Sequence, residues 1–284
     1  MKRIDRTPIE YFCHDCGKID ATFELDIKQQ FCKYVNGTCV KPRKSTPEVK
    51  VGICTVGASV NKKELQPVII CPQRFKEEQM FNAIREKYLT DWENVMWIPE
   101  VDMGVGGSVD YVAVELDRNQ QIRDFQCVEI QAAGTTGTPY PYIQDFQRYH
   151  DFSHGRYTYG INWANEFSKT MMQQAYKKGK IVQSWKRKII FVIQDVAMDY
   201  LQCSSDCSKV TSFVKDNPVD FCVFSLSWFG DRWGLEFKDI YSTTIEGIET
   251  IIGGAPEEKF PTVEEFKEKI LKKGISDRLL RNIP

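Results

Sequence analysis

The stretch that decides the fold is GGSVDYVAVELDRNQQIRDFQCVEIQAAGTTG, residues 106–137, which has the pattern of two strands joined by a turn near DRNQ. Side chains along a strand alternate between the two faces of a sheet, so Glu129 and Gln131 share one face. The valine and isoleucine that alternate with them point the other way, toward apolar packing. If the two strands pair in antiparallel fashion, Asp110 on the first strand comes close to Glu129 on the second.

Two neighbouring carboxylates repel each other, and burying them is costly unless a cation compensates the charge. Carboxylate oxygens, a backbone carbonyl and water are the ligands that Mg²⁺ prefers. Glu100, just upstream in WIPEVD, offers a third acid. This set suits metal-assisted hydrolysis of a phosphodiester, in which the cation polarises a phosphoryl oxygen and activates a water. The alternative is that the acids of a half-exposed hairpin simply face solvent.

Composition sets only broad limits on function. The chain has 284 residues with 38 basic and 39 acidic side chains, so net charge gives no sign of nucleic-acid binding and does not exclude it. The charged N-terminus lacks the apolar segment of a signal peptide, and no apolar run is long enough to cross a bilayer. We therefore expect a soluble cytoplasmic protein, in which ten cysteines favour metal ligation over a disulfide scaffold.

The pattern along the rest of the chain predicts a mixed α/β fold. Apolar spacing favours a helix over residues 74–89, and INWANEFSKTMMQQAYKKGK predicts a second helix with Gly179 near its C-terminus. The segments that we expect to form strands are NVMWIPEVDM, KRKIIFVIQD and VDFCVFSLSW. TVEEFKEKILKKG predicts a helix capped by Thr262, with Glu265 at the spacing of a capping box. Residues 1–75 are cysteine-rich, irregular and short of helical periodicity, and KPRKSTPEVK within them is predicted as a polar loop.

Six cysteines lie within the first 75 residues, and four thiolates would suit a tetrahedral site for zinc or a single iron. Cys13 and Cys16 form a CxxC pair, the usual first half of such a site. Spacing alone leaves open which four cysteines ligate, and some of them are alternatively ordinary buried thiols. The six are Cys13, Cys16, Cys32, Cys39, Cys54 and Cys71.

These motifs together resemble the NotI-type restriction endonucleases, a group of PD-(D/E)xK nucleases in which Gln131 stands in place of the usual lysine. The resemblance spans Phe31 to Asp195, more than half of the chain, in the order in which the family has its motifs. The matching pieces are FCKYVNGTC, GICTVG, IICPQRF, GSVDYVAVE, VEIQAAGTTG, INWAN and KIIFVIQD.

The resemblance implies a small N-terminal subdomain, residues 1–75, that binds iron through four cysteines, followed by a PD-(D/E)xK nuclease domain over residues 76–284. That core is a mixed central sheet flanked by helices. The motifs match Cys32, Cys39, Cys54 and Cys71 as the iron ligands, with zinc as an alternative metal, and leave Cys13 and Cys16 without a counterpart. A closed shell of four thiolates implies a structural role for the metal.

The resemblance also implies the catalytic set and the reaction. Glu100, Asp110, Glu129 and Gln131 match the catalytic pattern, with Asp102 as the competitor of Glu100, and the Mg²⁺ ligands would be Asp110, Glu129 and the carbonyl of Ile130. The implied activity is that of a type II enzyme, a homodimer that cleaves double-stranded DNA at a palindromic site, because twofold symmetry matches a palindrome. The alternatives are a non-specific or repair DNA nuclease and a catalytically inactive DNA-binding module.

Overall fold

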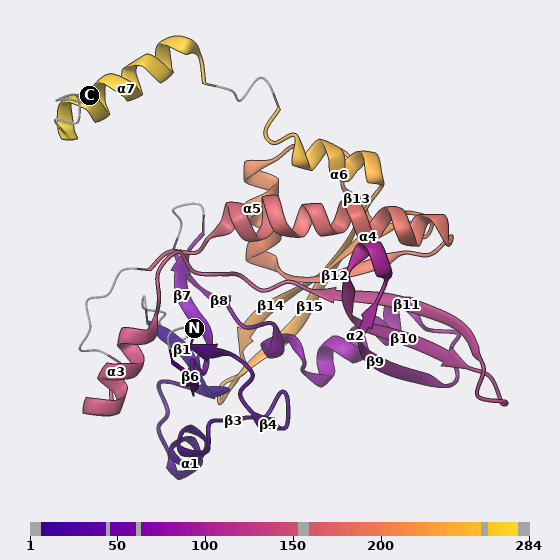
Figure 1. The fold of residues 1–284 in the computed structure, drawn as a ribbon, viewed down its shortest axis with the longest axis horizontal. Coiled ribbons are helices and arrows are strands. Elements are labelled where there is room, and N and C mark those ends of the chain that lie inside the picture. The colour runs from indigo at the N-terminus through magenta and orange to yellow at the C-terminus, as the bar shows by residue number, and fades with distance from the viewer. Residues whose placement is uncertain (1–6, 44–45, 61–63, 153–158, 257–260, 278–284) are drawn as a thin grey trace.

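The computed structural model describes residues 7–43, 46–60, 64–152, 159–256 and 261–277. Its largest element is a seven-stranded mixed sheet, in the order β13-β15-β14-β12-β11-β10-β9 (Figure 1). The strands are β9 (Val95–Asp102), β10 (Ser108–Leu116), β11 (Ile122–Ile130), β12 (Ile189–Gln194), β13 (Thr211–Ser212), β14 (Val219–Trp228) and β15 (Trp233–Thr243).

The sheet has a parallel centre between antiparallel edges. Strands β9, β10 and β11 form an antiparallel meander, β11, β12 and β14 run parallel, and β14 pairs antiparallel with β15. The long apolar runs in β12 and β14 are buried on both faces, as parallel central strands require. The predicted strands over NVMWIPEVDM, the hairpin, KRKIIFVIQD and VDFCVFSLSW are all present.

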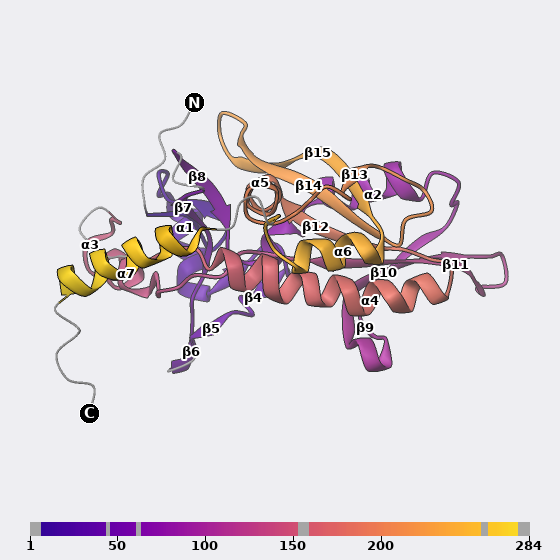
Figure 2. The ribbon, with the colours of Figure 1, turned by 90° about the horizontal axis from the view of Figure 1, so that it is seen from above.

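Helices cover both faces of this sheet. One face carries α4 (Met172–Ser184), α5 (Asp195–Ser204) and α6 (Ile245–Ile252), and the other carries α2 (Glu78–Tyr88) (Figure 2). Strand alternation divides the core accordingly: Val128 and Ile130 pack on the α2 side with Met80 and Ile84, whereas Cys127 packs on the α4 side. The central sheet with flanking helices agrees with the predicted mixed α/β class.

The N-terminal region has more regular structure than its sequence predicts. A four-stranded sheet, in the order β2-β1-β7-β8, is accompanied by helix α1 and two short hairpins, one of which occupies the segment predicted as a polar loop. Helix α3 packs beside it through Phe146, which contacts Tyr11 and Phe23. The elements are β1 (Pro8–Tyr11), β2 (His14–Asp15), α1 (Ala21–Gln29), β3 (Phe31–Cys32), β4 (Gly37–Thr38), β5 (Pro42–Arg43), β6 (Thr46–Lys50), β7 (Ile53–Ser59), β8 (Leu65–Ile69) and α3 (Tyr140–Tyr149).

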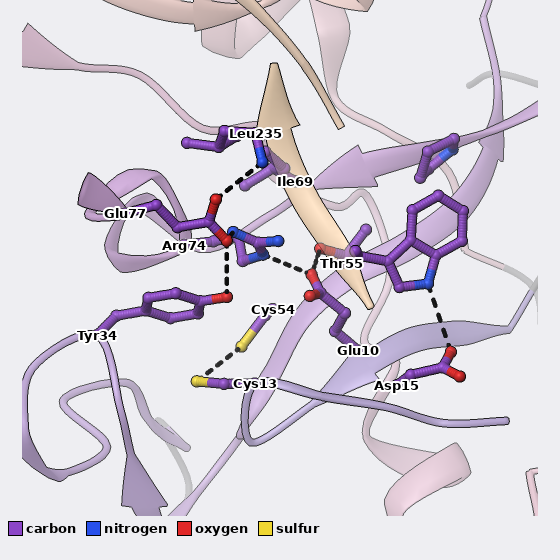
Figure 3. Close-up of polar contacts among 12 residues, drawn as sticks. Glu10, Cys13, Asp15, Tyr34, Cys54, Thr55, Ile69, Arg74, Glu77 and Leu235 are labelled. Atoms are coloured by element: carbon purple, nitrogen blue, oxygen red, sulfur yellow. Dashed lines mark hydrogen bonds and ion pairs between the residues drawn. The ribbon is translucent and has the colours of Figure 1, made fainter. Parts of the chain in front are cut away.

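A buried ion network joins this sheet to the larger one (Figure 3). The Arg74 guanidinium donates from Nε to Glu10 of β1 at 2.7 Å and from Nη1 to Glu77 at 2.5 Å. Glu77 in turn accepts from the backbone N–H of Leu235 in β15 at 2.8 Å. Gln194 of β12 makes a second link, because its side chain bonds both the N–H of Ile69 and the carbonyl of Pro67. The two sheets are therefore held together by buried polar contacts.

Two predicted helices differ in detail from their sequence patterns. The segment 74–89 begins as a 3-10 turn, η1 (Pro72–Phe75), before α2. The helix after INW begins as a π-helical segment, η3 (Ala164–Met171), and continues in α4 to Ser184, so Gly179 lies in its interior and not near its end.

The last helix, α7 (Val263–Asp277), lies away from the large sheet in both views (Figures 1 and 2). It has the predicted capping box, since Glu265 N–H donates to Thr262 Oγ1 and Thr262 N–H donates to Glu265 Oε2. None of the helices in the described part of the chain is long and apolar enough to cross a membrane.

Candidate active site

Asp110 and Glu129 lie opposite each other on neighbouring strands. The antiparallel β10–β11 ladder ends at the pair Tyr111–Val128, and the same register continued by one residue puts Asp110 opposite Glu129. Directly opposed residues in such a ladder share a face of the sheet. The hairpin register therefore brings the two acids together, as the sequence pattern predicts.

Each acid is anchored through one oxygen by a donor of the chain. The backbone N–H of Ile130 donates to Asp110 Oδ2 at 2.7 Å, and Lys178 Nζ lies 2.8 Å from Glu129 Oε1. The second oxygen of Glu129, Oε2, is buried and has no hydrogen-bond partner. Burying an oxygen without a partner costs free energy, so a bound ligand at this position would stabilise the site by contacting Oε2.

The electrostatic environment of Glu129 also indicates that its negative charge is incompletely compensated. Burial raises the pKa of the Glu129 carboxyl and the nearby Asp110 carboxylate raises it further, whereas the Lys178 ammonium and the backbone N–H of Asp110 lower it. A single lysine compensates only one of the two negative charges. The donor set, two carboxylates beside the backbone of Ile130, is chemically suited to a hard divalent cation such as Mg²⁺.

The register also distinguishes the two candidate upstream acids. Val109 pairs with Val101 and Tyr111 with Pro99, which puts Glu100 opposite Asp110 on β9. Glu100 is exposed and has a positive φ of 53°, a conformation that is uncommon for a residue other than glycine. Asp102 instead accepts from the backbone N–H of Gly104, in the turn η2 (Gly104–Gly106). The arrangement favours Glu100 as the third acid.

Gln131 follows the end of β11 and is partly exposed. Its backbone N–H donates to the carbonyl of Val192 in β12, and its side-chain amide donates to the carbonyl of Ala132 at 3.0 Å. The amide is thus satisfied locally, by a bond that does not involve either acid. An amide neither titrates nor carries charge, so Gln131 cannot serve as a general base.

Lys178 is the site residue that sequence reasoning missed. It lies on the buried stripe of α4, together with Met172, Ala175 and Val182. A lysine inside an apolar stripe with helical spacing is unusual, since buried lysines are almost always paired. That anomaly was the available signal, but the sequence does not say which carboxylate the lysine meets.

The four cysteines matched as metal ligands line one narrow cavity in the N-terminal region. Cys13 lines it too, with its sulfur 3.5 Å from that of Cys32 and 3.9 Å from that of Cys54, whereas Cys16 does not. Sulfurs around one tetrahedral metal with bonds of about 2.3 Å lie about 3.8 Å apart. Cys13, which had no counterpart by resemblance, is therefore part of the cluster. The four matched cysteines that line the cavity are Cys32, Cys39, Cys54 and Cys71.

The presence of these cysteines in one cavity does not by itself establish a metal site. Among the residues that the structure describes, no group of three or more His, Cys, Asp or Glu side chains is arranged to hold a metal ion. The four-cysteine site stays a prediction, supported by the soft-donor chemistry of its thiols.

Comparison with family models gives a match to Restriction endonuclease NotI over residues 19–223. This range covers more than two thirds of the chain, and it includes the acid pair, Lys178 and all the cavity cysteines except Cys13. The chain belongs to the NotI restriction endonuclease family. Comparison with curated proteins gives no match.

Membership of the NotI family indicates a nuclease, a hydrolase whose substrate is DNA. Within the family match, the two unusual parts of the molecule are the acid pair on the hairpin and the thiol cavity beside the smaller sheet. Only the acid pair combines opposed carboxylates with an orphaned oxygen, so it is the candidate for the hydrolytic centre of this NotI-family protein.

Proposed function

We propose that the protein is a type II restriction endonuclease of the PD-(D/E)xK class, which hydrolyses phosphodiester bonds of double-stranded DNA at a specific palindromic site with Mg²⁺. The observation that carries this proposal is the opposition of Asp110 and Glu129 on β10 and β11, with Glu129 Oε2 buried and lacking a partner. Family membership supports the substrate class. The enzyme would act in the cytoplasm.

Each residue of the candidate site has a proposed role in the hydrolysis. Asp110, Glu129 and the carbonyl of Ile130 would hold Mg²⁺, which when bound supplies Lewis-acid polarisation of the phosphoryl oxygen and activation of a water. Ile130 N–H fixes the Asp110 carboxylate, and Lys178 fixes that of Glu129. Glu100, on the exposed edge strand β9, would bind a second cation or a water at the mouth of the site. Gln131 would turn from Ala132 to orient the water or to donate to a phosphate oxygen.

The same proposal includes a structural metal and a two-part chain. Residues 1–75 would form a metal-binding subdomain in which Cys32, Cys39, Cys54 and Cys71 ligate iron, or zinc, and residues 76–284 would form the nuclease domain. The shared cavity of these thiols supports this proposal, and the neighbouring Cys13 competes for a place in the ligand set.

Symmetry supports a homodimer, because each subunit of a twofold dimer would cut one strand of a palindrome. Sedimentation at micromolar concentration should give about twice the chain mass of 32.9 kDa. A monomer that remains monomeric on DNA would contradict the proposed assembly.

The test of the activity is incubation of the protein with plasmid DNA and Mg²⁺. Discrete fragments support a restriction enzyme, whereas a smear would indicate a non-specific or repair nuclease. Retained DNA binding without cutting would indicate an inactive binding module. Sequencing the fragment ends would then give the recognition site and the position of the cut.

A further inference from the structure

Lys178 bridges the two strands that carry the acid pair. Its ammonium lies 2.8 Å from Glu129 Oε1 on β11 and donates to the carbonyl of Ser108 on β10 at 2.7 Å. The side chain is almost completely buried. A buried ammonium is stable only when it is paired, so both contacts are needed to hold it there.

Close packing fixes the part of α4 from which Lys178 reaches the site. At Gly179, a Cβ atom would lie 2.8 Å from Val219 Cγ2 and 2.9 Å from Ile245 Cδ1, so a side chain there would force these methyl groups to shift. On the other side, a Cβ at Gly106 would lie 2.6 Å from Ile181 Cδ1, so the turn before β10 also rests on α4. The ammonium is therefore held from a rigid element and not from a mobile loop.

We propose that Lys178 is a positioning residue of the acid pair: it occupies Glu129 Oε1, so that Glu129 presents only Oε2 to a divalent cation, and it supplies the fixed positive charge that Gln131 cannot. This inference rests on the proposed Mg²⁺-dependent cleavage. The positive charge would then come from helix α4, whereas the usual motif places its lysine directly after β11, at the position of Gln131.

Two opposite effects follow from this arrangement. The ammonium competes with a cation for the charge of Glu129, which weakens cation binding to the free protein. The same fixed charge and the orientation of Oε2 favour the transition state of phosphodiester hydrolysis, in which negative charge develops on the phosphate oxygens. Loss of Lys178 should therefore tighten cation binding and slow cleavage at the same time.

The experiment compares Lys178→Met with wild type, with Lys177→Met as the matched control because Lys177 is exposed on the same helix. Mg²⁺ binding to each DNA-free protein is measured by calorimetry, and thermal melting checks folding. Single-turnover cleavage and DNA affinity are measured separately. Lys178→Gln is the second variant, since it removes the charge while keeping a hydrogen-bond donor.

For both Lys178 variants we expect Mg²⁺ to bind about threefold tighter or more, and cleavage to slow by about 30-fold or more with DNA affinity unchanged. Lys177→Met should match wild type in all measurements. Cleavage near the wild-type rate, Mg²⁺ affinity that falls together with the rate, or loss of folding in both Lys178 variants would each overturn the inference. Failure of the proposed function would instead appear in the wild-type protein, as an absence of cutting with Mg²⁺.

Discussion

At the scale of single residues, Glu129 is held where its own charge is unfavourable. It is buried beside Asp110, its pKa is raised for that reason, and one of its oxygens has no partner. Buried acids with a purely structural role are normally paired, whereas strongly shifted pKa values cluster at functional sites. This contrast separates Glu129 from Glu115, a buried acid on the same hairpin that pairs with Arg123.

Replacing Glu129 by glutamine should reduce cleavage by about 10³-fold, because removing the proposed ligand of the cation would forfeit several kcal/mol of transition-state stabilisation. The measurement is single-turnover cleavage of plasmid DNA with Mg²⁺. Asp124→Asn is the matched control, since Asp124 lies on the same strand but forms a half-exposed pair with Arg187 outside the site. Near-normal cutting by Glu129→Gln would contradict the proposed role of this acid.

The thiol cavity leads to a second prediction at this scale. Cys54→Ser should lose the bound metal, and Cys13→Ser should bind it less tightly than wild type, since the Cys13 sulfur lies 3.5 Å from that of Cys32. Cys16→Ser is the control, because Cys16 does not line the cavity. Metal content of the purified proteins decides the point: full occupancy in Cys13→Ser would restrict the ligands to the four cysteines matched by motif.

At the scale of elements, strand alternation and helical periodicity were enough to predict strands β9, β10, β11, β12 and β14 and the helices that contain α2, α4 and α7, but not β15, α5 or α6. They also predicted that Asp110 and Glu129 meet, because the pairing of a hairpin is local. The sequence could not identify the partner of Lys178, since the contact with Glu129 joins elements far apart in the chain. The smaller sheet was missed for a related reason: β1 and β2 are short, and β1 pairs with β7 across an intervening helix and two hairpins.

Helix α4 should tolerate no larger residue at Gly179. Gly179→Val would place methyl groups against Val219 and Ile245, which the close approach of the helix leaves no room for. We expect a loss of about 2 kcal/mol or more in the free energy of unfolding, from overpacking and the poorer helix propensity of valine. Chemical denaturation measures the loss, with Gln173→Ala on an exposed position of α4 as control. Equal stability of the two variants would argue against the packing described here.

At the scale of the whole molecule, the two sheets depend on the Glu10–Arg74–Glu77 network for their attachment. The sequence gives no sign of this link. Arg74 and Glu77 are close in sequence and resemble an ordinary surface pair, and Glu10 lies far away in the chain. Only the fold places Arg74 fully inside the protein. The mixed class of the fold was thus predictable, and the way in which its two sheets are joined was not.

Replacing Arg74 by methionine should destabilise the protein by about 3–5 kcal/mol, because it leaves the Glu10 carboxylate buried without its cation. Adding Glu10→Gln to the same protein should recover part of that loss, since the uncompensated charge is then removed. Denaturant unfolding of the single and double variants is the measurement. A single variant as stable as wild type would show that the network does not hold the sheets together.

The bond from Leu235 to Glu77 joins residues 158 positions apart. On the ribosome, the cysteine-bearing segment would emerge on the order of ten to thirty seconds before β15 does, at the usual rate of synthesis. During that interval the thiols are already present while the strand that completes their anchorage has not been made. If these thiols bind the proposed metal, metal capture and thiol oxidation would compete on the nascent chain, and the metal supply during translation would limit how much metal-bound protein forms.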